Sequence, residues 1–325
     1  MAVPNSQYAN ELIAGTFDEC SGMVYDQVYR TTPLLDWLKR NQDVVGGGKL
    51  VTTKLLYAGG GRAKGFTTGS SFDLAQSDQF SRSMFPWVNY GVPVLVYDQD
   101  VMKNSGDAQI IDLAKEHMAE AKLDLADALA SDLLAAAYTD QSTSALPSLL
   151  IACDATSTIG GIAYDAFPGS NFEWVARLTS SGTFSIGMLE TAYNNCGLGK
   201  GGVYPTDLFG AQNMVESYKN LAGDYGRVDM GGKGGTDVDL GFERVYFRGK
   251  SFWLEPYLSD GVTLLLNKDL VKLVAHRRNA RRFITEVKPV SRTPGATEHT
   301  FWGMFSFRLK RRASIGMLTG ITAVT

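Results

Sequence analysis

The chain has 325 residues, of which 44% are apolar and 20% charged, a composition typical of a globular protein with one large or two ordinary domains. This composition excludes a disordered chain, and the formal net charge of −3 excludes a general basic surface for nucleic acid. The 35 glycines, many of them clustered, indicate long turns and excursions.

The first predicted elements are an arm and a short helix. Apolar residues follow a helical spacing over residues 8–30, although glycines weaken that helix. Thr32 is the expected N-cap of a second helix, with Pro33 at its first position and Arg40 in its last turn. The apolar face of that helix comprises Leu34, Leu35, Trp37 and Leu38.

Residues 46–97 have the pattern of an oversized hairpin. A strand is expected over residues 49–57 and a second extended stretch over residues 84–97. The polar segment between them carries three aromatic residues, Phe66, Phe72 and Phe80. Two strands alone are marginally stable, and so long a loop in a compact domain is usually functional or disordered. The aromatic residues favour docking of the hairpin onto another surface.

A long helix is the most regular predicted element. A turn at residues 104–106 precedes it, and the helix is expected over residues 107–138, with Asp107 near its N-terminus. About 30 residues would give a length of about 45 Å. The predicted apolar stripe comprises Ile110, Ala114, Met118, Ala121, Leu125, Ala128 and Leu129.

Residues 146–265 have the pattern of a compact α/β unit. Strands are predicted over residues 149–153, 203–209, 242–247 and 252–256. Helices are predicted over residues 174–178, 185–196 and 211–221. A tight turn through Arg248, Gly249 and Lys250 joins the last two strands.

The remaining segment returns to strands, which are predicted over residues 264–266, 270–276 and 301–310. One face of the last strand carries Phe301, Phe305, Phe307 and Leu309. Basic residues cluster at Arg277, Arg278, Arg281, Arg282, Lys310, Arg311 and Arg312. Two interpretations stay open: solvated strand ends, or ion pairs across a subunit interface and contact with a polyanion.

No motif supports a reaction. Residues 197–202 fit G-x-G-x-x-G but follow a predicted helix, the reverse of the dinucleotide context, and residues 231–236 lack the G-K-[ST] of a phosphate loop. The histidines lack zinc spacing, no serine lies in G-x-S-x-G, and Cys153 is expected in the core. Asp98 and Asp100 favour a solvated turn over a cation site. We therefore predict no enzyme and no catalytic, cofactor-binding or metal-ligating residue.

The three widely spaced cysteines, Cys20, Cys153 and Cys196, favour a reducing compartment over a disulfide framework. The first residues lack the features of a signal peptide, and no apolar run reaches membrane-spanning length. We therefore expect a soluble protein made inside a cell, with no membrane partner.

The order of elements resembles that of tailed-bacteriophage major capsid proteins of the HK-ninety-seven-type fold, over nearly the whole chain. The segments that carry the resemblance are "RTTPLLDWLKRN", "GGGKLVTTKLLYAG" and "PWVNYGVPVLVYDQDVMKNSG", followed by "GVTLLLNKDLVKLVAHRRNARRF" and "TFWGMFSFRLKRRASIGMLTGI". The implied α+β fold has an N-terminal arm with a short helix (1–45), an extended loop (46–97), a peripheral spine helix (98–145), an axial domain (146–263) and peripheral return strands (264–325).

The resemblance implies a head protein that forms hexamers and pentamers of an icosahedral shell around double-stranded DNA. It implies a location in the virion after assembly in the host cytoplasm, together with a portal, a separate scaffold protein and a decoration protein as partners, and non-specific contact with packaged DNA. The expected intersubunit contacts are Trp37, Arg62, Lys64, Phe66, Phe72, Phe80, Trp87, Arg277, Arg278, Arg281 and Arg282. Lys64 is also the candidate for a family-type crosslink, although no partner residue is identifiable and the bond is not predicted.

Two alternatives stay open. An encapsulin-like nanocompartment shell shares this fold and would enclose cargo protein instead of DNA. An unrelated α/β enzyme could use residues 46–97 as a lid, but the chain shows no convergent acid, base, nucleophile or metal set.

Overall fold

The computed structural model describes residues 32–57, 65, 67–68, 79–103, 113–167, 174–197, 203–224, 244–277, 285–287 and 296–324. Several predicted features lie outside these ranges, among them the arm helix over residues 8–30, the turn at 104–106, Asp107 at the start of the long helix, and the glycine-rich segment 231–236.

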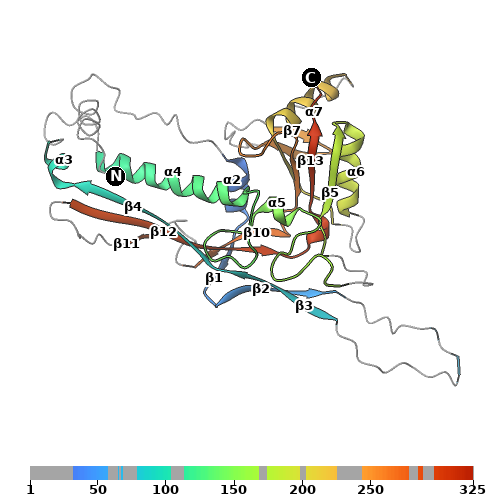
Figure 1. Ribbon diagram of the computed structural model, residues 1–325, viewed down its shortest axis with the longest axis horizontal. Helices are drawn as coiled ribbons and strands as arrows, with labels where there is room; N and C mark the ends of the chain where they lie inside the picture. The colour runs from blue at the N-terminus through green and yellow to red at the C-terminus, as the bar shows by residue number, and fades with distance from the viewer. Residues whose placement is uncertain are drawn as a thin grey trace.

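A long two-stranded ribbon runs through the elongated half of the molecule (Figure 1). Strand β12 (Ala296–Leu309) pairs antiparallel with β4 (Val88–Tyr97). The other edge of β12 pairs with β10 (Val271–His276) and β11 (Thr285–Val287), and β1 (Asp43–Val45) adds parallel to β10. The predicted apolar face of β12 is confirmed, because Phe301, Phe305, Phe307 and Leu309 are all buried.

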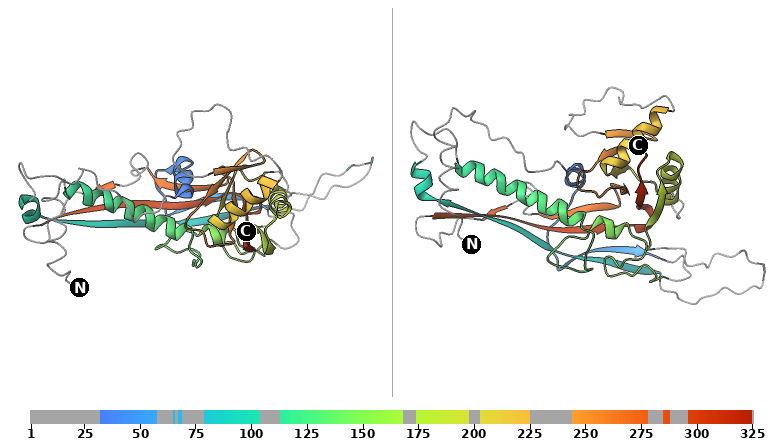
Figure 2. Two further views of the ribbon diagram at one scale, coloured as in Figure 1. Left: turned by 90° about the horizontal axis from the view of Figure 1, so that it is seen from above. Right: turned by 45° about the horizontal axis from the view of Figure 1, so that its top comes forward.

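Helix α4 (Leu113–Leu133) lies along one face of this ribbon, as both views in Figure 2 show. Its residues Ala121, Leu125 and Leu129 are buried as predicted, whereas Ala128 is exposed, contrary to the predicted stripe. The helix also ends at Leu133 and does not continue to residue 138. It ends there because the last turn tightens and the hydroxyl of Ser148 donates to the Ala135 carbonyl at 2.5 Å.

Helix α2 (Pro33–Arg40) is confirmed over the predicted residues. Thr32 precedes it but makes no side-chain capping bond. The apolar face is buried in the largest core cluster, which we call the main core. There Leu34, Leu35, Trp37 and Leu38 lie with residues of α4 and of the six-stranded sheet that forms the other half of the molecule. The short helix therefore joins the two halves of the subunit.

The hairpin is formed by β2 (Leu50–Leu56) and β3 (Phe80–Pro86), and it projects from the lower side of the molecule (Figure 1). The single extended stretch predicted over residues 84–97 is divided between two sheets, because β3 pairs with β2 and β4 pairs with β12. The division falls at Trp87, whose indole is buried and donates from Nε1 to the Gly48 carbonyl at 2.8 Å.

The other half of the molecule is built on a six-stranded sheet. Its order is β5 (Arg177–Thr183), β13 (Gly316–Thr322), β9 (Thr263–Leu266), β6 (Asp207–Gly210), β8 (Lys250–Leu254) and β7 (Arg244–Phe247). Helices α6 (Ile186–Gly197) and α7 (Gln212–Asp224) share a core with one set of its alternating residues, Leu208, Phe252, Leu265 and Leu318. Residues of the opposite face, including Phe209, Leu264 and Leu266, belong to the main core.

Three predictions for this half need correction. The apolar run predicted as a strand over residues 149–153 is helix α5 (Leu149–Ala152), with Ser148 as its N-cap; so short a run does not distinguish a strand from a buried helix. Residues 174–178 are not helical, since β5 begins within them. Strands β9 and β13 belong to the six-stranded sheet, whereas residues 264–325 were expected to be peripheral strands.

The tight turn between β7 and β8 is confirmed. Arg248 and Gly249 have φ values of 51° and 72°, the left-handed pair that a two-residue hairpin turn requires. The predicted helices over residues 185–196 and 211–221 are also confirmed, by α6 and α7.

Candidate interaction surface

The hairpin has one buried face and one exposed face. Val51, Leu55 and Phe85 point toward the subunit and are buried. The exposed side chains of the opposite face form two cross-strand pairs, Lys54 with Arg82 and Leu56 with Phe80. We call these four residues, Lys54, Leu56, Phe80 and Arg82, the hairpin face.

The hairpin face is unfavourable for an isolated subunit. Leu56 is 58% exposed and Phe80 is 73% exposed, although they lie directly opposite one another. Burying one such side chain contributes about 1.5–3 kcal/mol. Lys54 and Arg82 are like charges placed opposite each other, an arrangement that destabilises a strand pair. An apolar surface with nearby carboxylates would satisfy both pairs.

A second exposed patch lies at the far end of the β4–β12 ribbon. Leu95 is 43% exposed, Tyr97 39% and Met102, on helix α3 (Asp98–Lys103), 74%, and Asp98 beside them is exposed. Helix α4 covers the opposite face of this ribbon through Ala121. We call Leu95, Tyr97, Asp98 and Met102 the distal patch.

Among the residues that the structure describes, the cover over the ribbon face that carries Leu95 and Tyr97 lies near the hairpin base. There Val51, Trp87 and Val274 form a buried cluster against which Met304 packs. The hairpin and the distal patch lie at opposite ends of the elongated half (Figure 1). One subunit therefore cannot cover its own distal patch with its own hairpin face.

The predicted contact residues divide into three groups. Phe80 and Arg277 are exposed, consistent with a contact role. Trp37 and Trp87 are buried and make hydrogen bonds inside the subunit, and their assignment to an interface stays a prediction. The remaining predicted contacts, Arg62, Lys64, Phe66, Phe72, Arg278, Arg281 and Arg282, lie outside the described residues.

Trp37 shows why a tryptophan on a short helix is a weak indicator of an interface. Its Nε1 donates to Oδ2 of Asp207 at 2.9 Å, and its ring meets Phe209 edge-on at 5.5 Å between centroids. Both partners lie on β6, so the side chain joins α2 to the six-stranded sheet.

Arg312 corrects the prediction of a surface basic cluster at residues 310–312. Lys310 is exposed, but Arg312 is fully buried. Its Nε donates to the carbonyl of Ala152, its Nη1 to Ser157 and Trp174, and its Nη2 to Ile151 and Asp154, over 2.5–3.2 Å. Burial lowers the pKa of this guanidinium. The sequence of a basic cluster does not show that one of its arginines is buried and donates hydrogen bonds to five backbone carbonyls.

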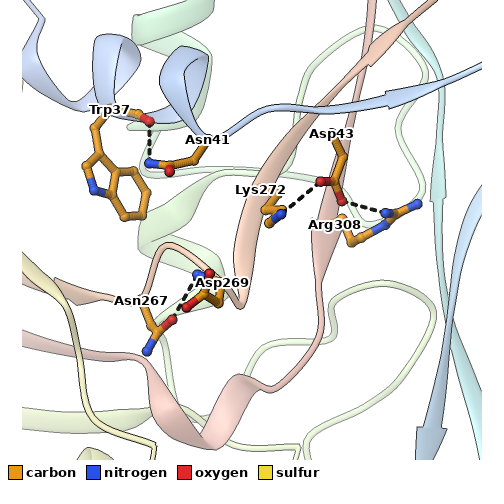
Figure 3. A network of polar contacts seen from close by, with 7 residues as sticks. All are labelled: Trp37, Asn41, Asp43, Asn267, Asp269, Lys272 and Arg308. Atoms are coloured by element: carbon orange, nitrogen blue, oxygen red, sulfur yellow. Dashed lines mark hydrogen bonds and ion pairs between the residues drawn. The ribbon is translucent and has the colours of Figure 1, made fainter.

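Two other cations pair with a single carboxylate within the subunit. Asp43 on β1 accepts from Nζ of Lys272 at 2.8 Å and from Nη1 of Arg308 at 2.6 Å (Figure 3). Burial alone would raise the pKa of Asp43, but the two cations outweigh burial and lower it. Figure 3 also shows Asn41 at the end of α2, where its Nδ2 donates to the Trp37 carbonyl. The contacts fix the segment between α2 and the ribbon.

Glu255 is a buried carboxyl that sequence reasoning did not single out. Its Oε2 accepts the backbone N–H of Leu34, in the first turn of α2, at 2.9 Å. Burial raises the pKa of Glu255 to about 7, against the opposing effect of the Leu34 and Tyr257 N–H groups. A buried glutamate at the end of a strand carries no recognisable motif.

The described residues contain no group of three or more His, Cys, Asp or Glu side chains that could hold a metal ion. Cys153 and Cys196 are buried thiols, and burial raises the pKa of both. Helix α6 ends at Gly197, so a helix precedes the glycine motif as predicted. Among the described helices, none combines the length and apolar character needed to span a bilayer.

Solved structures, but no family model or curated sequence, resemble this chain. The cyanophage A-1(L) capsid asymmetric unit superposes with a TM-score of 0.69 at 16% identity, over 94% of this chain and 97% of that one. The capsid of a native GTA particle gives 0.60 at 12% identity, over 98% and 100% of the two chains.

The chain has the HK-ninety-seven-type capsid fold. The holo-SrpI encapsulin complex of Synechococcus elongatus PCC 7942 has the same capsid fold, with a TM-score of 0.59 at 11% identity over 100% of this chain and 99% of that one. We propose that, in the terms of this fold, α4 corresponds to the spine helix, the six-stranded half to the axial domain and the hairpin to the extended loop.

Proposed function

We propose that this chain is the major capsid protein of a tailed phage and assembles through hexamers and pentamers into an icosahedral head around double-stranded DNA. The hairpin face is the observation that supports this proposal most strongly. It exposes an apolar pair, Leu56 and Phe80, and a basic pair, Lys54 and Arg82, on a projecting element. A second copy of the chain offers a fitting surface in its distal patch, which is apolar and carries Asp98.

In the proposed shell the hairpin lies over the neighbouring subunit, and a portal and a separate scaffold protein take part in assembly in the host cytoplasm. The exposed Arg277 supports non-specific contact with packaged DNA. A decoration protein and the arm over residues 1–31 would add further contacts in the virion. The subunit acts by assembly and containment, and no reaction is assigned to it.

The likeness to the encapsulin complex favours a second candidate, a nanocompartment that encloses protein cargo. The two candidates differ in what the purified particle contains. Nuclease-protected double-stranded DNA supports the phage head, whereas a co-purifying protein cargo without DNA supports the nanocompartment. Negative-stain microscopy of the full chain, expressed alone and together with a scaffold protein, tests both, since dispersed monomers at high concentration in both preparations contradict a shell of either kind.

A hairpin replacement tests the contact itself. The Tyr57 N–H donates to the Gln79 carbonyl at 2.9 Å, so Asn-Gly in place of residues 58–78 closes the hairpin with a two-residue turn. We expect the subunit to keep its thermal stability, because the described core uses none of the removed side chains, and to lose particle formation. Normal particles from this variant would show that the extended loop is not the assembly element.

A further inference from the structure

The outer edge of β3 is held by a loop and not by a strand. The Met84 N–H donates to the Gly160 carbonyl at 2.9 Å, and the Met84 carbonyl accepts from Nε2 of Gln141 at 2.8 Å. Both backbone polar groups of this hairpin residue are therefore satisfied by residues that lie outside the hairpin. Unpaired groups on an edge strand would otherwise face solvent.

One carboxylate holds the turn that reaches β3. Oδ1 of Asp140 accepts the Gly160 N–H at 2.9 Å, and Oδ2 accepts the Gly161 N–H at 2.8 Å. Hydrogen bonds to an ionised carboxylate are about twice as strong as neutral ones. A Cβ on Gly160 would lie 2.9 Å from the Phe85 ring, and the Gly160 φ of +66° also favours glycine, so a side chain at this position would clash with β3.

The same loop is fixed at other points to both halves of the molecule. Arg312, which precedes β13, donates to the carbonyls of Asp154 and Ser157 at 2.7 and 2.5 Å. At the far end of the loop, Phe167 stacks on Tyr57 at the end of β2, with 4.5 Å between ring centroids. The loop therefore contacts both hairpin strands and is itself held by the axial domain and by the segment that follows α4.

We propose that residues 139–142 and 154–167 form a brace that sets the direction of the hairpin relative to α4 and the axial domain, with Asp140 as its positioning residue. The consequence for assembly rests on the proposed shell function. A hairpin of fixed direction presents Leu56 and Phe80 to the neighbouring subunit at a defined angle. Pre-organisation of this kind reduces the ordering entropy that association costs.

Hydrogen exchange of the unassembled full chain tests the brace directly. Asp140→Asn replaces one acceptor oxygen by an NH2 donor, so two backbone N–H groups face a single acceptor. We expect the amides of residues 80–85 to exchange about tenfold faster, the change that corresponds to losing one net hydrogen bond, while α7 and β6 keep their protection. Asp260→Asn is the matched control, because it makes the same chemical change at an exposed aspartate that lies outside the brace.

Two results would overturn the brace: unchanged exchange in β3, or an equal acceleration in β3 and α7, which would show that Asp140 only supports global stability. If Asp140→Asn does not fold, Gln141→Ala removes a single bond to Met84 and is expected to give the same local pattern with a smaller acceleration. Particle assays on the same variants separate the two proposals. Absence of particles from the wild-type chain contradicts the shell function but leaves the exchange comparison decisive for the brace.

Discussion

At the scale of single residues, the buried polar side chains determine how the halves of the subunit are joined. Glu255 accepts from the first turn of α2, and Arg312 collects the carbonyls that surround α5. Among the described residues, neither Glu255 nor Arg312 forms an ion pair. Glu255 therefore titrates in a buried site, where its protonation state affects the stability of the fold.

Glu255 should make the subunit less stable as the pH rises toward 8. Burial raises its pKa from 4.5 to about 7, so the folded state favours the protonated form. The stabilisation that the folded state gains from protonated Glu255 is fully present below about pH 4.5 and is lost as the pH rises through 7. The free energy of unfolding falls by about 3 kcal/mol over this range. The negative charge of Asp36 adds to the raised pKa.

Urea unfolding of the wild type and of Glu255→Gln at pH 5 and pH 8 measures this effect. The glutamine keeps an acceptor for the Leu34 N–H but cannot ionise, so most of the difference between the two pH values should disappear. Glu216→Gln, at an exposed position on α7, is the control and should leave it in place. The range avoids the titration of Asp43, whose lowered pKa removes stability only in stronger acid. An equal pH dependence in all three proteins would contradict the assignment.

At the scale of elements, local patterns predict what depends on neighbours in the sequence. Alternation predicts β2 and the buried phenylalanine face of β12, and capping residues predict α2. Local patterns do not predict the choice of pairing partner. Residues on either side of Trp87 are equally extended, yet β3 pairs with β2 and β4 pairs with β12 near the other end of the chain. The hairpin face follows from that choice, because the pairing places Leu56 opposite Phe80.

The hairpin face should be needed for assembly but not for folding. In Leu56→Ser/Phe80→Ser, two exposed apolar side chains become polar, so the monomer should unfold within about 0.5 kcal/mol of the wild type. Loss of two contact side chains from each interface should reduce the particle fraction by more than tenfold at equal concentration, at about 1.4 kcal/mol per factor of ten. Sedimentation velocity measures the particle fraction. Thr52→Ser is the control, because Thr52 lies on the same exposed face but closer to the base of the hairpin. Assembly of the double variant at wild-type levels would exclude this face from the contact between subunits.

At the scale of the whole molecule, the chain crosses between its two halves several times. Helix α2 and β10 pack with the elongated half, β9 and β13 belong to the axial sheet, and β12 lies between them in sequence but runs the length of the ribbon. The proposed division into a loop, a peripheral domain and an axial domain is therefore one of space. Glycine clusters and composition mark where the chain leaves the core, but they do not show which half it returns to.

This crossing predicts that the C-terminal strand is essential to the axial domain. Strand β13 lies between β5 and β9, and it buries Leu318 and Ile321 against α6 and α7. Deleting residues 316–325 removes an interior strand and leaves the facing edges of β5 and β9 unpaired, so we expect an insoluble or molten product with loss of near-ultraviolet circular dichroism. Deleting Thr325 alone keeps β13 and should leave the spectrum unchanged. The hairpin replacement at residues 58–78 provides a contrast, since it shortens a projecting element and should not alter the spectrum. A soluble, cooperatively unfolding product from the longer deletion would show that the axial sheet folds without β13.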